Sequence, residues 1–302
     1  MQESTHDAPR LRVRGRHLLL GVAFFLLAAE ALARVLIAPP VSHLAPSPDT
    51  ALGHVLRSGT HDFEGNLRRI PTTTIHVDSM GCRVVTPDET HAGGILVLGD
   101  SFTHGDGVDA EKRWTERVNS RLSPGTPRLR NCAVPGYNLT QLARAAEVHA
   151  PSPALVLTVF SNDLRAASDV ASMLPLDDFP GLLQKHSRLV RFARVMMHLQ
   201  RGVLAKDHLS SPVIEDALDR LEGSVSANGP RIAVILVSPH HPSVDLARRL
   251  MARGWLVLTA PDLSAPGLRI PGDGHLNARG HQRVADWLHP LLEPALSATR
   301  SP

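Results

Sequence analysis

The chain has 302 residues and 43% apolar residues, which allows one large domain with a tail or two small domains, with enough apolar side chains for a sizeable core. The formal net charge is only +3, and four arginines lie within the first sixteen residues. Part of the positive charge therefore belongs to an N-terminal tail, and the net charge does not indicate nucleic-acid binding. One tyrosine and three tryptophans provide no stacking platform for single strands.

An apolar run at residues 17–38 follows a basic tail at residues 1–16. About twenty such residues can cross a membrane, with Glu30 and Arg34 four apart and able to pair on one helix face. A cleaved signal peptide, cut after the small-residue motif ALA that precedes Arg34, is the alternative. We favour the uncleaved anchor. Either way, the basic tail stays in the cytoplasm and the rest of the chain is exported, to a periplasmic or extracellular location.

Residues 39–76 are rich in proline, serine, histidine and threonine, and we expect a stiff linker there. Alternating apolar residues between 68 and 85 indicate a short strand pair. We place the folded domain at residues 77–298.

The rest of the chain alternates between strand and helix patterns, which predicts an α/β protein with a mostly parallel sheet and helices on both faces. The expected strands are 95–98, 128–133, 154–160, 232–237 and 255–258, and the expected helices are 110–122, 140–149, 213–225, 243–253 and 277–292. Residues 174–210 interrupt the alternation as a helical insertion. It could form a lid or a membrane-facing patch, but we favour plain core packing.

Two cysteines, Cys82 and Cys132, are the whole cysteine content of the chain. They could form a disulfide in an oxidising compartment or remain two separate buried thiols. No Cys-x-x-Cys or His-Glu-x-x-His spacing occurs, so we expect no metal site.

The sequence GDS at residues 99–101 follows the buried strand directly. The carboxyl end of a strand in an α/β sheet is where ligands bind, and glycine permits the sharp turn that exposes the next residues. This placement predicts Ser101 as a nucleophile. The alternative is that Asp100 and Ser101 only cap a helix.

Three further motifs follow predicted strands: VPGYN with Gly136, FSNDL with Asn162, and GDGHLN with Asp273 and His275. Glycine lets a backbone N–H approach a substrate closely, and an asparagine amide is a donor that stays protonated. A histidine can take the proton of a serine hydroxyl and so activate it. Each residue could instead serve a turn or a surface loop, but four such placements in order favour one site.

In these four motifs and their order, the chain resembles the SGNH hydrolases, also called GDSL lipases and esterases, and in particular bacterial members with one N-terminal transmembrane helix. The resemblance implies a flavodoxin-like three-layer α/β/α sandwich. It also implies Ser101 as nucleophile and His275 as general base. The oxyanion hole would be formed by the N–H groups of Ser101 and Gly136 and the amide of Asn162.

The last motif departs from the family pattern. The commoner pattern has aspartate three residues before the histidine, where this chain has Gly272, and Asp273 lies two before. We expect Asp273 to orient His275, because the adjacent glycines permit a tight loop. Asp262, or a Ser–His dyad without a carboxylate, is the alternative.

Three functions are compatible with this pattern. The first is an exported, membrane-tethered esterase acting on ester-bearing lipid or cell-envelope polysaccharide. The second is an O-acyltransferase of the same fold, and the third is a non-catalytic envelope binding module. Gly105, Gly107 and Ala110 match a dinucleotide fingerprint but lie six or more residues past the strand end, so we expect no cofactor.

Overall fold

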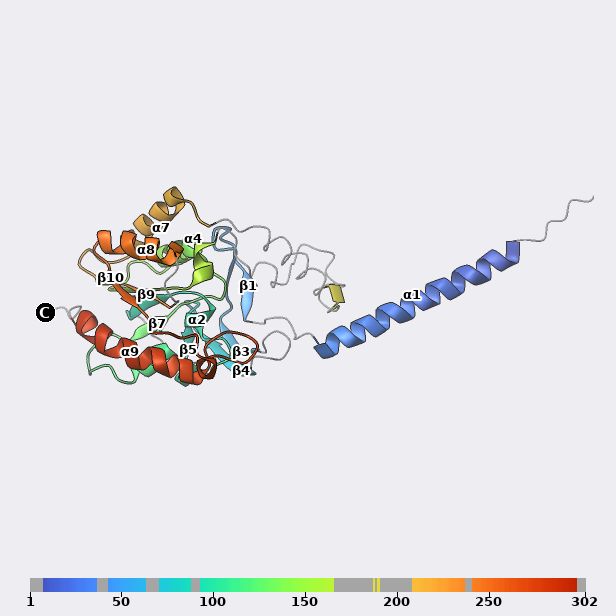
Figure 1. Cartoon of the computed structure of the whole chain (residues 1–302), viewed down its shortest axis with the longest axis horizontal. Coiled ribbons are helices and arrows are strands. Elements are labelled where there is room, and N and C mark those ends of the chain that lie inside the picture. The colour runs from blue at the N-terminus through green and yellow to red at the C-terminus, as the bar shows by residue number, and fades with distance from the viewer. Residues whose placement is uncertain are drawn as a thin grey trace, which may run out of the picture.

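The computed structural model describes residues 8–36, 43–63, 71–87, 93–165, 187, 189–190, 208–236 and 241–297. These residues form one N-terminal helix and an α/β unit, and Figure 1 shows the helix extending away from that unit. The predicted insertion at 174–210 lies outside the described residues except for six positions at and after Ser187.

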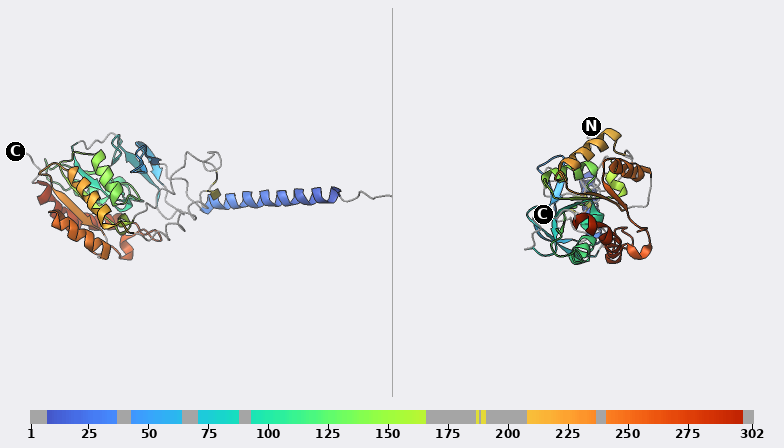
Figure 2. Two further views of the ribbon diagram at one scale, coloured as in Figure 1. Left: turned by 90° about the horizontal axis from the view of Figure 1, so that it is seen from above. Right: turned by 90° about the vertical axis from the view of Figure 1, so that its left-hand side faces the viewer.

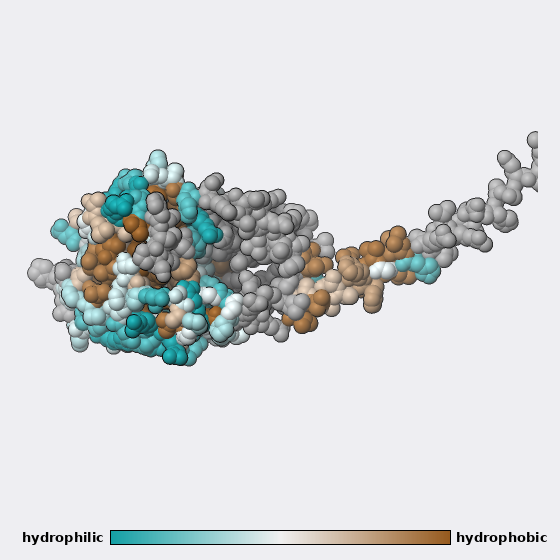
Figure 3. Space-filling view, viewed as in Figure 1, coloured by the Kyte–Doolittle hydropathy of each residue, from teal (hydrophilic) through white to brown (hydrophobic). Residues whose placement is uncertain are grey.

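Helix α1 (Ala8–Leu36) contains the predicted apolar segment. Its stretch His17–Val35 has a mean hydropathy of 2.1 and is only 6% buried, and Figure 3 shows the apolar colouring continuing along the helix. It is long and apolar enough to be a membrane span, and a signal sequence has the same properties. The predicted pair is present, with Arg34 Nε donating to Glu30 Oε1 at 2.9 Å.

An eight-stranded mixed sheet forms the centre of the α/β unit, in the order β10-β9-β8-β6-β7-β5-β4-β3. From β10 to β7 the neighbours are parallel, as predicted; from β7 to β3 they are antiparallel. The strands are β3 (Gly59–Phe63), β4 (Thr73–Val77), β5 (Arg83–Val84), β6 (Ile95–Leu98), β7 (Leu129–Asn131), β8 (Leu155–Val159), β9 (Arg231–Ile235) and β10 (Leu256–Thr259).

Helices cover both faces of this sheet (Figures 1 and 2). Successive strand residues point to opposite faces, and β6 shows this clearly: Leu96 and Leu98 belong to one apolar cluster, and Ile95 and Val97 to the other. The first cluster is completed by α4 (Leu139–Val148), α7 (Ser211–Gly223) and α8 (His241–Ala252), and the second by α3 (Trp114–Asn119) and α9 (Ala278–Ser297).

The expected linker at 39–76 is in part folded, so the predicted domain boundary at residue 77 is too late. This segment contains β3, β4 and a two-stranded antiparallel sheet of β1 (Leu44–Pro46) and β2 (His54–Leu56). Leu44, Leu56 and Ile75 are buried in the first apolar cluster. The linker prediction relied on the proline-rich composition of this segment. It was wrong because a few apolar side chains are enough to hold short strands against an existing core. The predicted strand pair between 68 and 85 is present as β4 and β5.

A disulfide joins Cys82 and Cys132, which decides between the two alternatives for these cysteines. Cys82 precedes β5 and Cys132 follows β7, two short strands that pair through Arg83 and Asn131. Disulfides persist in oxidising compartments. Together with the apolar helix α1, the disulfide suggests a protein located outside the cytoplasm.

Candidate active site

Ser101 lies directly beyond the buried strand β6. Gly99 is required at the turn, because a Cβ there would overlap the side chains of Thr158 and Thr103. Asp100 then caps the short helix α2 (Ser101–His104), its Oδ1 accepting a hydrogen bond from the Phe102 N–H at 3.0 Å. The capping alternative is therefore correct for Asp100, and it leaves the Ser101 hydroxyl free to face the cavity.

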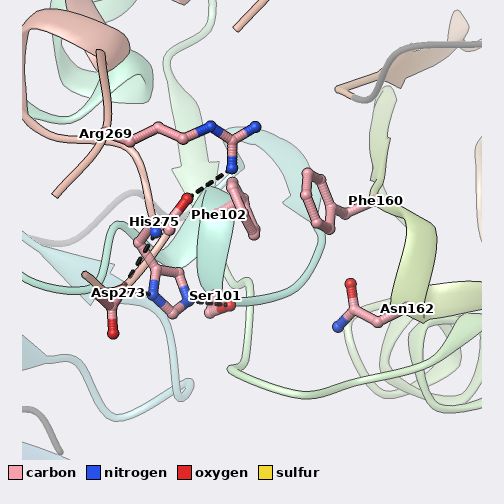
Figure 4. Close-up of a pocket in the computed structure, with 8 residues that line it drawn as sticks. Ser101, Phe102, Phe160, Asn162, Arg269, Asp273 and His275 are labelled. Carbon is pink, nitrogen blue, oxygen red and sulfur yellow. Dashed lines mark hydrogen bonds and ion pairs between the residues drawn. The ribbon is translucent and has the colours of Figure 1, made fainter. Parts of the chain in front are cut away.

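His275 reaches Ser101 from the loop before α9, and Asp273 in the same loop contacts His275 (Figure 4). The distance from His275 Nε2 to Ser101 Oγ is 2.8 Å, and His275 Nδ1 is hydrogen-bonded to Asp273 Oδ1. The backbone N–H of His275 donates to the same carboxylate oxygen at 3.1 Å. The loop is tight because Gly272 and Gly274 adopt positive φ angles of 76° and 99°.

The alternative orienting carboxylate, Asp262, lies elsewhere. It is exposed, and its Oδ1 accepts a hydrogen bond from the backbone N–H of Ser264 at 2.8 Å. The structure therefore pairs His275 with Asp273 although the spacing departs from the commoner pattern. This pairing is possible because only Gly274 separates Asp273 from His275, and the turn there brings the carboxylate back to the imidazole.

The electrostatic surroundings favour a charged His275. Burial lowers its pKa, but the hydrogen bond to Asp273 and the negative charges of Asp106, Asp273 and Asp100 outweigh burial, so the net shift is upward. Burial in turn raises the pKa of Asp273, but its hydrogen bond and attraction to His275 dominate and lower it. A histidine that is more basic than usual and held by an ionised carboxylate is suited to accept a proton from Ser101.

Asn162 lies across the cavity from His275, in the 3-10 helix η3 (Ser161–Leu164) that follows β8. Figure 4 shows its amide nitrogen turned toward Ser101. Gly136, with a φ of 76°, lies in the turn after β7, and Val134 in the same turn donates its N–H to Gly99 O at 3.0 Å. Because β7 and β8 flank β6, these turns lie on either side of the strand that carries Ser101. Gly136 is not among the residues that line the cavity described next.

A cavity of about 340 Å³ opens above these groups, lined by Ser101, Phe102, Phe160, Asn162, Arg269, Asp273, Gly274 and His275. Phe102 and Phe160 are stacked, with ring centroids 3.7 Å apart. Arg269 is fixed by donating to Leu263 O at 2.9 Å and Gly274 O at 2.7 Å. The sequence analysis did not identify Phe102, Phe160 or Arg269. Two of them could have been noticed, because Phe102 follows Ser101 directly and Phe160 precedes Asn162 by two residues.

Two buried carboxyl groups lie beneath the site and were also missed as functional candidates. Burial raises the pKa of Asp100 to about 6. Burial and the nearby Asp100 raise the pKa of Asp163, which accepts a hydrogen bond from the Phe160 N–H at 2.7 Å. Both carboxyl groups therefore take up a proton more readily than an exposed carboxyl group does.

A buried arginine supports the loop after α2. Arg83 donates to the carbonyl oxygens of His104, Gly105 and Val108 at 2.7, 2.8 and 2.9 Å. One cation thus satisfies three buried carbonyl groups, which fixes the chain that leads away from Ser101.

One group of three potential metal ligands occurs in the described part of the chain, formed by Cys82, Cys132 and His149. Both sulfur atoms belong to the disulfide, so this group lacks the thiolates that bind metal ions.

No protein-family model and no curated protein sequence matches this chain. The chemistry of the site is therefore inferred from its own geometry. A hydroxyl, an imidazole and a carboxylate in series, with an amide donor opposite, are groups that can activate a nucleophile and stabilise an oxyanion.

Proposed function

We propose that this protein is a serine hydrolase that cleaves an acyl ester through an acyl-enzyme. The observation that carries the proposal is the chain of contacts from Ser101 through His275 to Asp273, with 2.8 Å between Ser101 Oγ and His275 Nε2. A serine hydroxyl is a weak nucleophile until a base takes its proton, and the base must itself be oriented.

In the proposed reaction, the Ser101 Oγ attacks the ester carbonyl carbon while its proton passes to His275 Nε2. The carbonyl oxygen becomes negatively charged and accepts hydrogen bonds from the Asn162 amide and the N–H groups of Ser101 and Gly136. Collapse of this intermediate breaks the bond to the alcohol oxygen, which receives the proton from His275. Water then repeats the sequence, giving the carboxylic acid and free Ser101. Donors fixed at the oxyanion contribute about 3 kcal/mol each to lowering the barrier.

The same residues support membership of the SGNH hydrolases, with the sheet and its two helical layers as a flavodoxin-like three-layer sandwich. The motifs with Ser101, Asn162 and His275 all follow parallel strands or lie before the last helix, and their side chains line one cavity. With α1 as an uncleaved anchor, the enzyme would act outside the cytoplasm on ester-bearing lipid or envelope polysaccharide.

The test is ester hydrolysis by the purified full-length chain in detergent, using p-nitrophenyl acetate and a fluorophosphonate probe that labels activated serines. We expect turnover and labelling for the wild type and for Ser120→Ala, which removes an exposed serine that does not line the cavity. Ser101→Ala should lose both. Hydrolysis that is unchanged in Ser101→Ala would refute the proposal.

Adding a sugar acceptor to the same assay distinguishes hydrolysis from transfer. Faster release of p-nitrophenol together with an acylated sugar would identify an O-acyltransferase. Absence of both turnover and labelling in the wild type would instead favour a non-catalytic binding module.

A further inference from the structure

We propose that Arg269 is a positioning residue of the reaction, which acts by fixing the peptide group between Gly274 and His275. The imidazole of His275 and the carboxylate of Asp273 are held in place through that peptide group. This inference rests on the proposed function. It gives Arg269 a task that the spacing of the last motif creates, because a carboxylate only two residues before the histidine requires a sharply bent loop.

The peptide group before His275 is held at both of its ends. Its carbonyl oxygen, that of Gly274, accepts a hydrogen bond from Arg269 Nη1 at 2.7 Å, which Figure 4 draws as a dashed line. Its N–H, that of His275, donates to Asp273 Oδ1 at 3.1 Å. The same carboxylate oxygen is hydrogen-bonded to His275 Nδ1. The guanidinium and the orienting carboxylate therefore fix one peptide plane between them, and the imidazole is carried by the next α-carbon.

The loop needs such an external contact because it contains two glycines. Gly272 and Gly274 have positive φ angles of 76° and 99°. Glycine adopts positive and negative φ about equally well, so the freedom that permits the tight turn also permits other conformations. Within the loop, the Ile270 N–H donates to His275 O at 2.8 Å, and the Asp273 N–H donates to Ile270 O at 3.2 Å. The hydrogen bond from Arg269 adds the contact that fixes the peptide group next to the histidine.

The guanidinium is itself fixed, so it can hold the loop in a defined position. Its Nε donates to Leu263 O at 2.9 Å, and Leu263 is buried in the second apolar cluster. Its carbon lies 5.9 Å from the centre of the Phe102 ring, which belongs to the same cluster. The backbone of Arg269 also pairs with that of Leu276 in an antiparallel bridge. A planar guanidinium donates in a rigid fork and can hold two carbonyl groups at once, whereas the ammonium group of lysine is a single point.

The experiment measures kcat and KM for p-nitrophenyl acetate with the full-length chain in detergent. Arg269→Ala should lower kcat by about 100-fold and change KM by a much smaller factor, because a displacement of about 1 Å in a catalytic group has an effect of that size. Arg269→Lys keeps the charge but cannot hold both carbonyl groups, and it should show an intermediate loss of kcat. Arg279→Ala removes an exposed arginine of α9 that does not line the cavity beside Ser101, and this matched control should keep the wild-type kcat and KM.

A double-variant cycle shows whether Arg269 acts through Asp273. In the Asp273→Asn background, Arg269→Ala should lower kcat by less than about tenfold, because residues in one hydrogen-bonded network have non-additive effects. The same loss of kcat in both backgrounds would show that Arg269 acts separately, and it would overturn the inference. A change in KM without a change in kcat would place Arg269 in substrate binding and would overturn it too.

Thermal unfolding of each variant separates positioning from folding. If Arg269→Ala does not fold, Arg269→Lys takes its place in the cycle and should show the same non-additivity. A folded variant that hydrolyses the ester as fast as the wild type overturns the positioning inference alone. A wild type that does not hydrolyse the ester overturns the proposed function as well.

Discussion

His275 Nε2 lies 2.8 Å from Ser101 Oγ, although 174 residues separate the two in the chain. The strand β6 presents Ser101, and a glycine-flanked loop before α9 returns His275 to the same edge of the sheet. Asp273 binds the other ring nitrogen, so the imidazole is held in the tautomer whose Nε2 can accept a proton.

The contact between Ser101 and His275 predicts non-additive losses. Ser101→Ala and His275→Ala should each lower kcat by at least about 10⁴-fold, and the double variant should be no slower than the worse single variant, because nucleophile and base act as one unit. Single-turnover and steady-state rates with p-nitrophenyl acetate test this. Losses that multiply in the double variant would show that the two residues act separately.

Asp273→Asn should lower kcat by about 10⁴-fold and change the pH profile. The catalytic form of His275 is neutral, and its pKa is raised above the ordinary 6.5, so kcat/KM should rise with pH through that raised pKa. Removing the carboxylate charge removes one cause of the raised pKa, so the residual activity should reach its plateau at lower pH. Asp262→Asn is the control and should leave rate and profile unchanged; the opposite pattern would make Asp262 the partner.

Asn162→Ala should reduce kcat by about 100- to 1000-fold with little change in KM, because its hydrogen bond strengthens only as the oxyanion forms. Asn162→Asp keeps the shape of the side chain but replaces the donor with a carboxylate. We expect it to be at least as slow as the alanine variant. A KM effect without a kcat effect would place Asn162 in ground-state binding instead.

The disulfide between Cys82 and Cys132 should stabilise the fold rather than take part in catalysis. It closes a loop with a sequence separation of 50 residues. Replacing both cysteines by serine should lower the free energy of unfolding by about 2–4 kcal/mol, measured by urea denaturation of the full-length chain in detergent. The double variant should match the wild type after reduction. Equal stability of oxidised wild type and double variant would contradict a structural role.

Helix α1 should keep the protein in the membrane. We expect the full-length chain to remain in the membrane fraction through alkaline carbonate washing, and an alkaline phosphatase fusion after residue 60 to be active. A soluble product that begins at Arg34 would show that the helix is a cleaved signal peptide.

The strand and helix pattern from Ile95 onward was predictable from the sequence, because each buried strand or amphipathic helix carries its own periodicity. The positions of Ser101 and Asn162 after such strands were predictable for the same reason: the carboxyl ends of parallel strands meet at one edge. His275 comes instead from the loop before α9. The antiparallel strands β3 to β5 were only partly anticipated, since they are short and lie in a proline-rich segment.

Only the tertiary structure decided which distant groups meet. Sequence spacing left Cys82 and Cys132 either paired or separate, and it left both Asp273 and Asp262 as partners for His275. It also said nothing of the stack between Phe102 and Phe160. Local periodicity reports which side of an element is buried. Pairing depends on where separate elements place their ends, and that is determined by packing across the whole core.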